Sequence, residues 1–403
     1  MAKVWQTVII GGGASGLAAA VFCARAQGGE QVLVLEKAPR VGKKLLATGN
    51  GTCNITNRLA TPPHYHGANI AFTAPVLNAF TPDDCLLFFD SLGIVCAERE
   101  NGRYYPLCEQ AAAVLDCLRL ELNRLGVTVR TECAVTAVKP QKNRVDVHTA
   151  EETFTAQNVL LCTGGAASPS LGGSVDGYAL ATALGHRKTP LFPAIVQVKT
   201  DTTFIKAMKG LRTDAAVTFV LDGKPLCTHT GELLFTEYGI SGPAVMQISR
   251  AVGDWERRKN GTMLAKIDLL PSMTDEALAR HLASRPRRTA EDFLTGLLHK
   301  RIGQTVCRAA GFSLGDTVND VSRLVETIKR FTVTVGGTQG FGGAQVTAGG
   351  IDTREVDPLT LESRLAPHVY LLGELLDVDG DCGGYNLHWA WASAYAAAKA
   401  VSR

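Results

Sequence analysis

The sequence predicts an α/β protein in which a Rossmann-like domain is interrupted by an inserted domain. The chain opens with a strand, a glycine-rich turn, a helix and a second strand within about thirty residues, which is a βαβ unit. Its character changes after Thr189, where strand-like pieces and then a helical pattern follow. It closes on an apolar strand and an alanine-rich helix. The first βαβ unit cannot fill a sheet alone, and this last strand and helix would complete it.

Apolar runs and helix signals define the elements of the first region. Strands at residues 8–10 and 31–35 flank a helix over 14–27. The loop 37–58 that follows is long, which is typical of a functional segment. Helices are expected at 81–92, with Thr81 as N-cap, and at 110–125. We further expect short antiparallel strands at 127–131, 135–138, 144–149 and 153–155, a buried strand at 159–163 and a helix at 176–186.

Turn signals and a change of period divide the inserted region. Strand-like pieces stand at 195–199, 215–221 and 264–269, before a helical pattern and a strand at 331–335. The last strand and helix are expected at 369–372 and 387–401. We therefore predict a first domain over residues 1–189 and 344–403, an inserted strand-rich domain over 190–270 and 331–343, and a helical subdomain over 271–330 nested in the insert.

Composition excludes several classes of protein. Hydrophobic residues make up 46% of the 403, so a disordered chain is excluded. The balance of 41 basic and 38 acidic residues, a formal charge of +3, gives no reason to expect a nucleic-acid partner. Eleven cysteines without a CxxC pair argue against disulfides and zinc and fit a reducing cytoplasm. No apolar run reaches the roughly 18 residues of a membrane span, so we expect no membrane partner. Together with the cysteines, this leads us to expect a cytoplasmic protein without a metal.

The glycine-rich turn carries a dinucleotide fingerprint. Residues 11–16 satisfy G-x-G-x-x-G between a strand and a helix, and Glu36 follows twenty residues past the last glycine. Gly11 permits the tight turn, Gly13 leaves the backbone open to a pyrophosphate, and Gly16 lets helix and strand pack closely. Glu36 would accept hydrogen bonds from the ribose hydroxyls.

The phosphates are expected at the start of the following helix. Ala14 and Ser15 begin it, and its unpaired N–H groups and positive dipole end favour an anion. An incidental glycine-rich turn is the alternative. The fingerprint does not distinguish NAD from FAD. Glycines at 337–343 lack a following helix and a spaced acid, so we expect one dinucleotide site.

Four blocks of the sequence are long enough to be specific. They read VIIGGGASGLAAA, EKAPRVGKKLLATGNGTCNITN, LFTEYGISGPAV and VTAGGIDTREVDPLTLESRLAPHVYLLGELLDVDGDCGGYNLHWAWASAYAAA. Together they resemble the YhiN/BaiN-like family of bacterial FAD-dependent oxidoreductases over nearly the whole chain. The resemblance implies tightly bound, non-covalent FAD on a Rossmann-like domain of glutathione-reductase topology. It also implies that the insert is a β-barrel carrying a small helical insert.

By this resemblance the cofactor contacts fall where strands end and helices begin. Beyond the first turn, they are expected at Lys37, Lys43, Lys44, Thr48, Gly49, Asn50, Gly51, Ala134, Val135, Thr163, Gly164, Gly165, Asp176, Gly373, Glu374, Asp379, Gly384, Tyr385, Asn386 and Leu387. The lysines would neutralise the pyrophosphate, residues 48–51 would lie against the isoalloxazine, and the backbone at 134–135 would meet the adenine edge.

Several of these assignments leave alternatives open. The lysines are otherwise a solvated basic loop, residues 48–51 an Asn-Gly turn, and Asp176 a helix N-cap. Either Glu374 or Asp379 would bind ribityl hydroxyls, and the other would be structural. The N–H groups that open the last helix would point at flavin N1 and the C2 carbonyl and stabilise the anionic reduced form.

The chemistry would be carried by flavin N5, while the protein orients and tunes it. Tyr385, His388 and Arg103 are candidates for a catalytic group, with packing as the alternative for each, and His64-x-His66 is not expected to bind a metal. We predict a reductase that takes hydride from NAD(P)H, a transient donor, and passes it to a small organic acceptor with a conjugated C=C or C=O. A flavin-dependent RNA-modifying enzyme and a non-catalytic flavin sensor are the alternatives.

Overall fold

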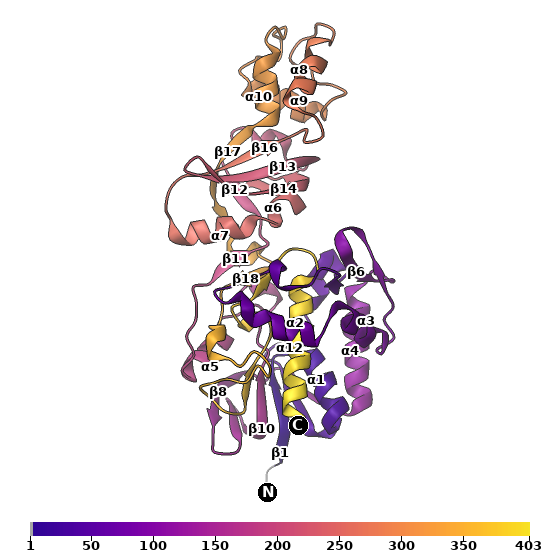
Figure 1. Ribbon diagram of the computed structural model, residues 1–403, viewed down its shortest axis with the longest axis vertical. Helices are drawn as coiled ribbons and strands as arrows, with labels where there is room; N and C mark the ends of the chain where they lie inside the picture. The colour runs from indigo at the N-terminus through magenta and orange to yellow at the C-terminus, as the bar shows by residue number, and fades with distance from the viewer. Residues whose placement is uncertain (1–2) are drawn as a thin grey trace. The chain divides into compact units, whose positions relative to one another are not determined.

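The chain forms two compact units, each with its own hydrophobic core (Figure 1). The computed structural model describes residues 3–403. The first unit comprises Met1–Leu191 and Val346–Arg403, and the second Phe192–Gln345. The chain leaves and re-enters the first unit at neighbouring points, since the Thr189 N–H donates to the Gly350 carbonyl at 2.8 Å.

The first unit is built on one mainly parallel sheet, confirming the predicted Rossmann-like fold. The strand order is β7-β2-β1-β10-β9-β8, with β19 beside β10. The strands are β1 (Val4–Ile10), β2 (Val32–Leu35), β7 (Thr128–Arg130), β8 (Val135–Pro140), β9 (Val145–Thr149), β10 (Thr153–Leu161) and β19 (Val369–Leu371). Strands β2, β1, β10 and β19 run parallel where they pair, and their apolar runs are buried.

Two strand predictions in this sheet are wrong. The pieces expected at 153–155 and 159–163 are one strand, β10, because Gln157 and Asn158 interrupt the apolar run but not the ladder. Its first half pairs antiparallel with β9, and its later part pairs parallel with β1 and β19. The segment expected as antiparallel at 127–131 is β7, which is parallel to β2 because a helix returns the chain to the same end of the sheet.

Helices cover the sheet close to the predicted positions, but those expected at 81–92 and 176–186 end earlier, at Asp90 and Ala183. Helix α1 (Ala14–Gln27) packs against both α12 (Tyr385–Val401) and α4 (Ala111–Leu125). Alanines on α12 permit that close approach, while Trp389 and Trp391 fill the core. Helix α3 (Pro82–Asp90) starts with a capping box between Thr81 and Asp84. The remaining helices of the unit are α2 (Thr73–Ala79) and α5 (Asp176–Ala183).

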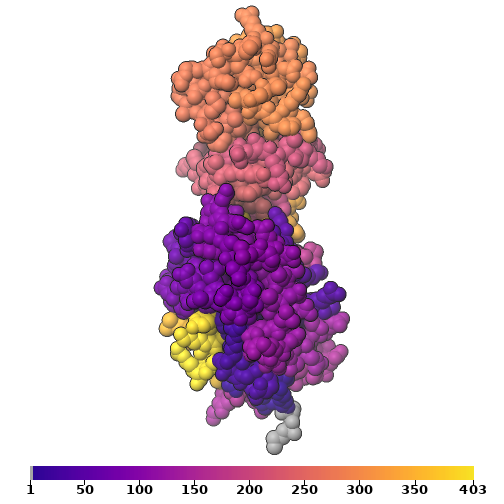
Figure 2. All heavy atoms as spheres, turned by 90° about the vertical axis from the view of Figure 1, so that its right-hand side faces the viewer, coloured from indigo at the N-terminus to yellow at the C-terminus, as the bar shows by residue number. Residues whose placement is uncertain are grey.

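Small sheets connect the long loop after β2 to the chain's last segment. Strand β3 (Thr56–Asn57) pairs with β6 (Arg103–Pro106), which pairs with β5 (Cys96–Glu98). Strand β4 (Tyr65–His66) pairs with β20 (Asp379–Gly380), just before α12. In Figure 2 the purple segments that follow β2 cover the visible face of this unit. The loop therefore lies at the N-terminus of α12.

The second unit is a closed barrel with helices at its sequence insertions, and the predicted barrel is confirmed. Its strand order is β12-β15-β14-β13-β16-β17. The strands are β12 (Val198–Thr200), β13 (Arg212–Leu221), β14 (Lys224–Phe235), β15 (Gly239–Ser241), β16 (Met263–Asp268) and β17 (Phe331–Thr338). Strand β14 escaped prediction because most of its residues are polar and partly exposed.

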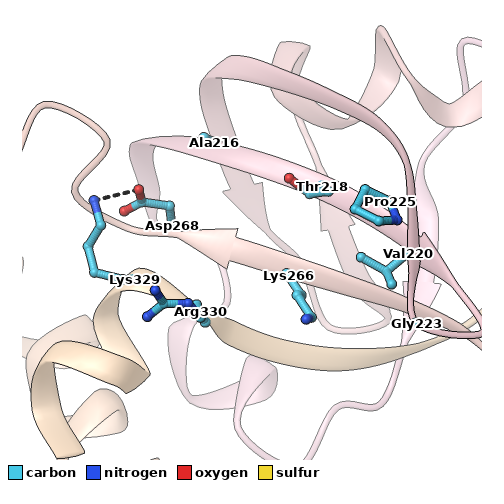
Figure 3. A pocket seen from close by; sticks show the side chains of 9 residues that line it. All are labelled: Ala216, Thr218, Val220, Gly223, Pro225, Lys266, Asp268, Lys329 and Arg330. Carbon is cyan, nitrogen blue, oxygen red and sulfur yellow. Dashed lines mark ion pairs between the residues drawn. The ribbon is translucent and has the colours of Figure 1, made fainter. Parts of the chain in front are cut away.

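Three helices of the insert lie between β16 and β17. They are α8 (Asp275–Ala283), α9 (Lys300–Ala309) and α10 (Val321–Lys329). Lys329 joins them to the barrel, because its Nζ lies 2.6 Å from Asp268 Oδ2 and donates to the carbonyls of Leu270 and Met273. This ion pair borders a pocket of about 290 Å³ on the barrel wall (Figure 3). The charge of Lys329 is therefore neutralised within the protein.

The second unit should fold when residues 192–345 are expressed alone, because a closed barrel has no free sheet edge and this one encloses a separate core. We expect strand-type circular dichroism and a cooperative thermal transition. The variant Ile267→Asp, which places a charge in the barrel core, should abolish that transition. A wild-type fragment that melts without cooperativity would contradict independent folding.

Candidate functional site

The first turn lies at the carboxyl edge of the parallel strands. Strands β1 and β10 end side by side at Ile10 and Leu161. Gly11 has a φ of 107°, and a Cβ there would lie 2.4 Å from the Cys162 carbonyl oxygen. A Cβ on Gly16 would lie 1.9 Å from the Gly11 carbonyl oxygen. Only glycine fits at both positions, which leaves the start of α1 tight against the sheet.

Gly13 differs from its neighbours, because a Cβ there would meet no protein atom within 4 Å. The same is true of Gly164, just after β10. The hydroxyl of Thr163 is buried and has no hydrogen-bond partner among residues 3–403. Open space beside a helix start, next to an unpaired buried hydroxyl, fits a phosphate-bearing cofactor.

The residues expected to hold the adenosine lie together. Glu36 accepts hydrogen bonds from the N–H groups of Gly12 and Ala38, at 2.7 and 2.8 Å, through different oxygens. Each oxygen keeps a second lone pair for a ribose hydroxyl. The Cys133 N–H donates to the Glu36 carbonyl at 2.9 Å, which places Ala134 and Val135 beside it.

Two of the three predicted lysines pair with predicted acids. Lys37 contacts Asp176 at 2.8 Å and Lys44 contacts Glu374 at 2.7 Å. Asp176 is the first residue of α5 and Val175 is the N-cap; hydrogen bonds from Lys37 and Ser174 lower the pKa of the Asp176 carboxyl. Lys43 is exposed, with no ion-pair partner in the described chain.

Glu374 and Asp379 have different surroundings. The Glu374 carboxylate also accepts the Thr347 N–H at 2.8 Å and would touch a Cβ placed on Gly165. It is partly exposed at the strand ends, near the open side of the turn. Asp379 is buried in the ladder of β20 with β4. A Cβ on Gly373 would lie 2.9 Å from the Ser15 hydroxyl, so the segment that carries Glu374 meets the start of α1.

Residues 48–51 form an irregular loop with backbone exposed. Gly49, Asn50 and Gly51 all have positive φ, at 56°, 55° and 91°. The Thr48 hydroxyl donates to the Leu45 carbonyl at 2.6 Å, and a Cβ on Gly51 would meet nothing within 4 Å. The loop thus offers backbone with open space over it, as a flat ring requires.

The start of α12 also presents bare backbone. Its first ladder bond runs from the His388 N–H to the Gly384 carbonyl at 3.0 Å, so the N–H groups of Tyr385, Asn386 and Leu387 have no acceptor within the helix. The Asn386 side chain exchanges two hydrogen bonds with the Gly380 backbone, both 2.8 Å. A Cβ on Gly384 would lie 2.5 Å from the Thr56 carbonyl oxygen.

Arg103 and Tyr385 both lie near this start, and Arg103 acts electrostatically on the Tyr385 phenol. A Cβ on Gly383 would be 3.0 Å from Arg103 Nε, and Arg103 opposes the rise in the pKa of Tyr105 that burial causes. Arg103 is half-buried and makes no ion pair with a carboxylate within residues 3–403. Burial and the Asp381 charge raise the pKa of the Tyr385 phenol to about 12 against the opposing effect of Arg103, so it is protonated at neutral pH.

His388 is committed to the fold. It is fully buried, with Nδ1 2.8 Å from the Thr56 hydroxyl and Nε2 3.2 Å from the Phe80 carbonyl. Burial lowers its pKa to about 4, which fixes a neutral ring that donates to Phe80 and accepts from Thr56. Both ring nitrogens therefore join α12 to other segments.

Two features of the site were not predicted from the sequence. The side-chain oxygen of Asn54 is buried, lacks a partner in the described chain, and would lie 2.8 Å from a Cβ on Gly384. His64 and His66 both contact Asp381.

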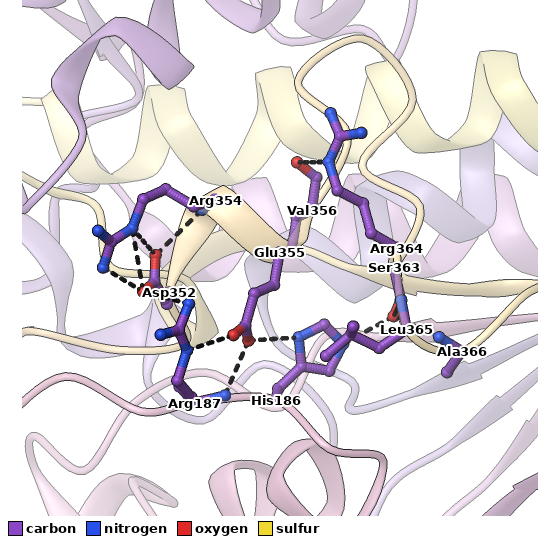
Figure 4. A network of polar contacts seen from close by, with 10 residues as sticks. All are labelled: His186, Arg187, Asp352, Arg354, Glu355, Val356, Ser363, Arg364, Leu365 and Ala366. Atoms are coloured by element: carbon purple, nitrogen blue, oxygen red, sulfur yellow. Dashed lines mark hydrogen bonds and ion pairs between the residues drawn. The ribbon is translucent and has the colours of Figure 1, made fainter.

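A polar network farther along the chain links the returning segment to the end of α5. In it Arg187 pairs with Glu355, and Arg354 pairs with Asp352 (Figure 4).

A mainly parallel sheet with a barrel inserted before its last strand, carrying this glycine turn, is the architecture of FAD-binding Rossmann-like oxidoreductases, and the protein is a flavoprotein of that class. Residues 5–400 match the family described as HI0933-like protein Rossmann domain. The chain belongs to this family, and the predicted YhiN/BaiN-like resemblance is confirmed.

Curated relatives match over almost their full length. The 3-dehydro-bile acid delta(4,6)-reductase of Clostridium scindens is 42% identical, with 98% of each chain covered. The ribosomal RNA dihydrouridine synthase of Haemophilus influenzae is 32% identical with 100% of each covered, and that of Escherichia coli is 31% identical with 98% and 97% covered.

Solved structures share the fold at low identity. The 3-ketosteroid delta1-dehydrogenase of Sterolibacterium denitrificans superposes with a TM-score of 0.56 at 12% identity, covering 99% of each chain. The 3-ketosteroid-delta4-(5alpha)-dehydrogenase of Rhodococcus jostii gives 0.51 at 14% identity, covering 100% of this chain and 98% of the other. None of the helices in residues 3–403 combines the length and apolar character needed to cross a membrane.

Gly13→Val should give folded but colourless protein. A Cβ at this extended position would meet no protein atom within 4 Å, so valine should be tolerated by the fold, yet it fills the space beside the helix start. Flavin absorbance per mole of purified protein and the far-UV spectrum measure the two effects. Gly315→Val, a similarly open position in the second unit, should remain yellow. A Gly13→Val protein with full flavin content would refute this placement of the cofactor.

Stability should fall below pH 6.5 because of His388. Its imidazole stays neutral in the folded chain to about pH 4, whereas the unfolded ring gains a proton from about pH 6.5 downward. The stabilisation is present above that range and lost as pH falls through it, by roughly 3 kcal/mol at 1.36 kcal/mol per unit. Urea unfolding at pH 7 and 4.5 measures the loss.

His388→Gln should remove that pH dependence, because an amide can still accept from Thr56 and donate to Phe80 without gaining a proton. His148→Gln, on the partly exposed β9, serves as the control and should keep the wild-type difference between the two pH values. An equal loss in wild type and His388→Gln would show that other groups cause it.

Proposed function

We propose that this flavoprotein takes electrons from NAD(P)H and reduces a carbon–carbon double bond conjugated with a carbonyl in a small organic acceptor. The observation that carries the proposal is the Arg103 guanidinium, which has no carboxylate partner within residues 3–403 and acts electrostatically on the protonated phenol of Tyr385 near the start of α12. Such a pair suits an acceptor whose oxygen gains negative charge while one carbon gains a proton.

The names of the curated relatives support this chemistry. One is a delta(4,6)-reductase of a 3-dehydro bile acid, whose double bonds are conjugated with a ketone. The others are dihydrouridine synthases, and dihydrouridine is uridine hydrogenated at a double bond conjugated with a carbonyl. We favour a small molecule over RNA because the reductase has the higher identity and the net charge of this chain is only +3.

The cofactor would be held by groups already described. The N–H groups opening α1 and the space at Gly13 suit the pyrophosphate, Glu36 the ribose, and Glu374 the ribityl chain. The backbone at 48–51 and the opening N–H groups of α12 suit the isoalloxazine. When bound, the flavin supplies the hydride.

The protein's own groups act on the acceptor. Arg103 has no carboxylate partner in the part of the chain that the structure describes, so its charge is available to the acceptor's carbonyl oxygen. Tyr385 keeps its proton at neutral pH and is therefore suited to donate it. The roles of Arg103 and Tyr385 are those of an oxyanion-stabilising cation and a general acid.

The test is anaerobic stopped-flow reduction of the holoprotein by NADH and NADPH, followed by reoxidation with cyclic enones and with a uridine-rich RNA. We expect bleaching by a nicotinamide and rapid reoxidation by an enone. Tyr385→Phe and Arg103→Gln should each slow reoxidation about 100-fold while keeping bound flavin, because each removes one transition-state interaction.

Matched controls lie on or beside the same strand. Tyr104→Phe alters a partly exposed residue that bonds to Glu98, and Arg99→Gln alters an exposed residue that pairs with Glu109; both variants should keep wild-type rates. If neither NADH nor NADPH reduces the flavin, NAD(P)H is excluded as the electron donor. Reoxidation by the RNA and by none of the enones would replace the small-molecule acceptor with the RNA-modifying alternative.

A further inference from the structure

An Asp–His–His cluster without an assigned role lies next to Tyr385. His64 Nδ1 is 3.0 Å from Asp381 Oδ2, and His66 Nε2 is 2.8 Å from Asp381 Oδ1. The side chains are 32%, 37% and 20% exposed for His64, His66 and Asp381. One carboxylate therefore receives an N–H from each of two rings, and each donating nitrogen is unavailable to a metal.

Backbone hydrogen bonds join the two segments that carry the cluster. The ladder of β4 with β20 pairs Asp379 with His66, and the Asp381 N–H donates to the His64 carbonyl at 2.9 Å. Burial raises the pKa of Asp381, but hydrogen bonds and charge from the two histidines outweigh it and lower that pKa overall. The carboxylate is thus ionised at neutral pH and holds both rings in fixed orientations.

The ring of His64, held by Asp381, in turn contacts the ring of Tyr385. The two rings stack with centroids 4.7 Å apart and planes 18° apart. The Tyr65 hydroxyl donates to the Tyr385 carbonyl at 3.0 Å, which fixes the backbone beneath the ring. Arg103 is the other charged group acting on the phenol. Tyr385 is therefore held by its backbone from one side and by the ring of His64 from the other.

We propose that Asp381, acting through His64, is a positioning residue that orients the Tyr385 phenol for proton donation. The inference rests on the proposed function. Reduction of a conjugated C=C needs one proton besides the hydride. The Tyr385 O–H bond breaks as a C–H bond forms next to the acceptor's carbonyl, and the phenolate then recovers a proton from water. A phenol free to rotate would reach the acceptor carbon less often.

Asp381→Asn, Tyr385→Phe and the double variant test this in the holoprotein. We expect Asp381→Asn to lower kcat roughly 10-fold with KM and flavin content unchanged, and to raise the solvent isotope effect, since misplacement slows proton transfer. In the Tyr385→Phe background the same change should have no further effect, because the group it positions is gone. Additive losses would overturn the inference.

Nuclear magnetic resonance of ring-labelled tyrosine provides a readout independent of turnover. The Tyr385 signal is identified by its absence in Tyr385→Phe, and Asp381→Asn should shift or broaden it. If Asp381→Asn fails to fold, His64→Phe, which keeps a ring but loses the carboxylate contact, should change the signal and kcat in the same direction. An unchanged signal in the folded variant refutes positioning even if the enzyme reduces enones.

Glu355→Gln is the matched control. Its carboxylate lies 3.4 Å from the ring of buried His186, without hydrogen-bond geometry, elsewhere in the same unit. It should leave the Tyr385 signal and kcat as in wild type. If wild-type protein reduces no acceptor, the proposed function fails, while the resonance experiment still decides whether Asp381 orders Tyr385.

Discussion

The site depends on two places where helix backbone approaches another chain segment too closely for any side chain. Gly16 sets α1 against the Gly11 carbonyl, and Gly384 sets α12 against the Thr56 carbonyl. Each helix consequently presents N–H groups to the edge of the sheet. Helices α1 and α12 also pack along one another, so the N–H dipoles at their two starts are held in a fixed relation. A negative charge placed near them is therefore stabilised without any rearrangement of the protein.

Around these helix starts the charged groups fall into two kinds. Lys37, Lys44 and their acidic partners are neutralised within the protein and hold neighbouring loops together at the strand ends. Arg103 makes no ion pair with a carboxylate of residues 3–403, and the Tyr385 phenol keeps its proton at neutral pH. The first kind links neighbouring loops, whereas the second is the pair to which we assign the proposed chemistry. Since all of these residues lie in the first unit, the barrel's separate core does not contribute to this division.

The sequence predicted correctly those features that depend on neighbouring residues, such as helix caps and glycine turns. Thr81 and Pro82 located the start of α3, and the glycine spacing located a turn with open space at Gly13. The polar pair Gln157 and Asn158 divided one strand into two in the prediction, because the ladder with β1 that continues through them is made across the sheet and is not visible in the local sequence. The contact of His64 with Asp381 joins residues far apart in the chain, and no spacing in either segment indicates it. Only the pairing of β4 with β20 brings them together.

The order of the chain imposes an order on biosynthesis. Strand β19 and helix α12 follow the insert, yet α12 supplies one of the two helix starts and packs along α1. While the polypeptide is still being made, the barrel is complete and able to fold, whereas the sheet lacks a strand and exposes the apolar face of α1. The first unit can therefore be completed only after the whole insert has been synthesised, and until then the face of α1 that α12 covers has no partner.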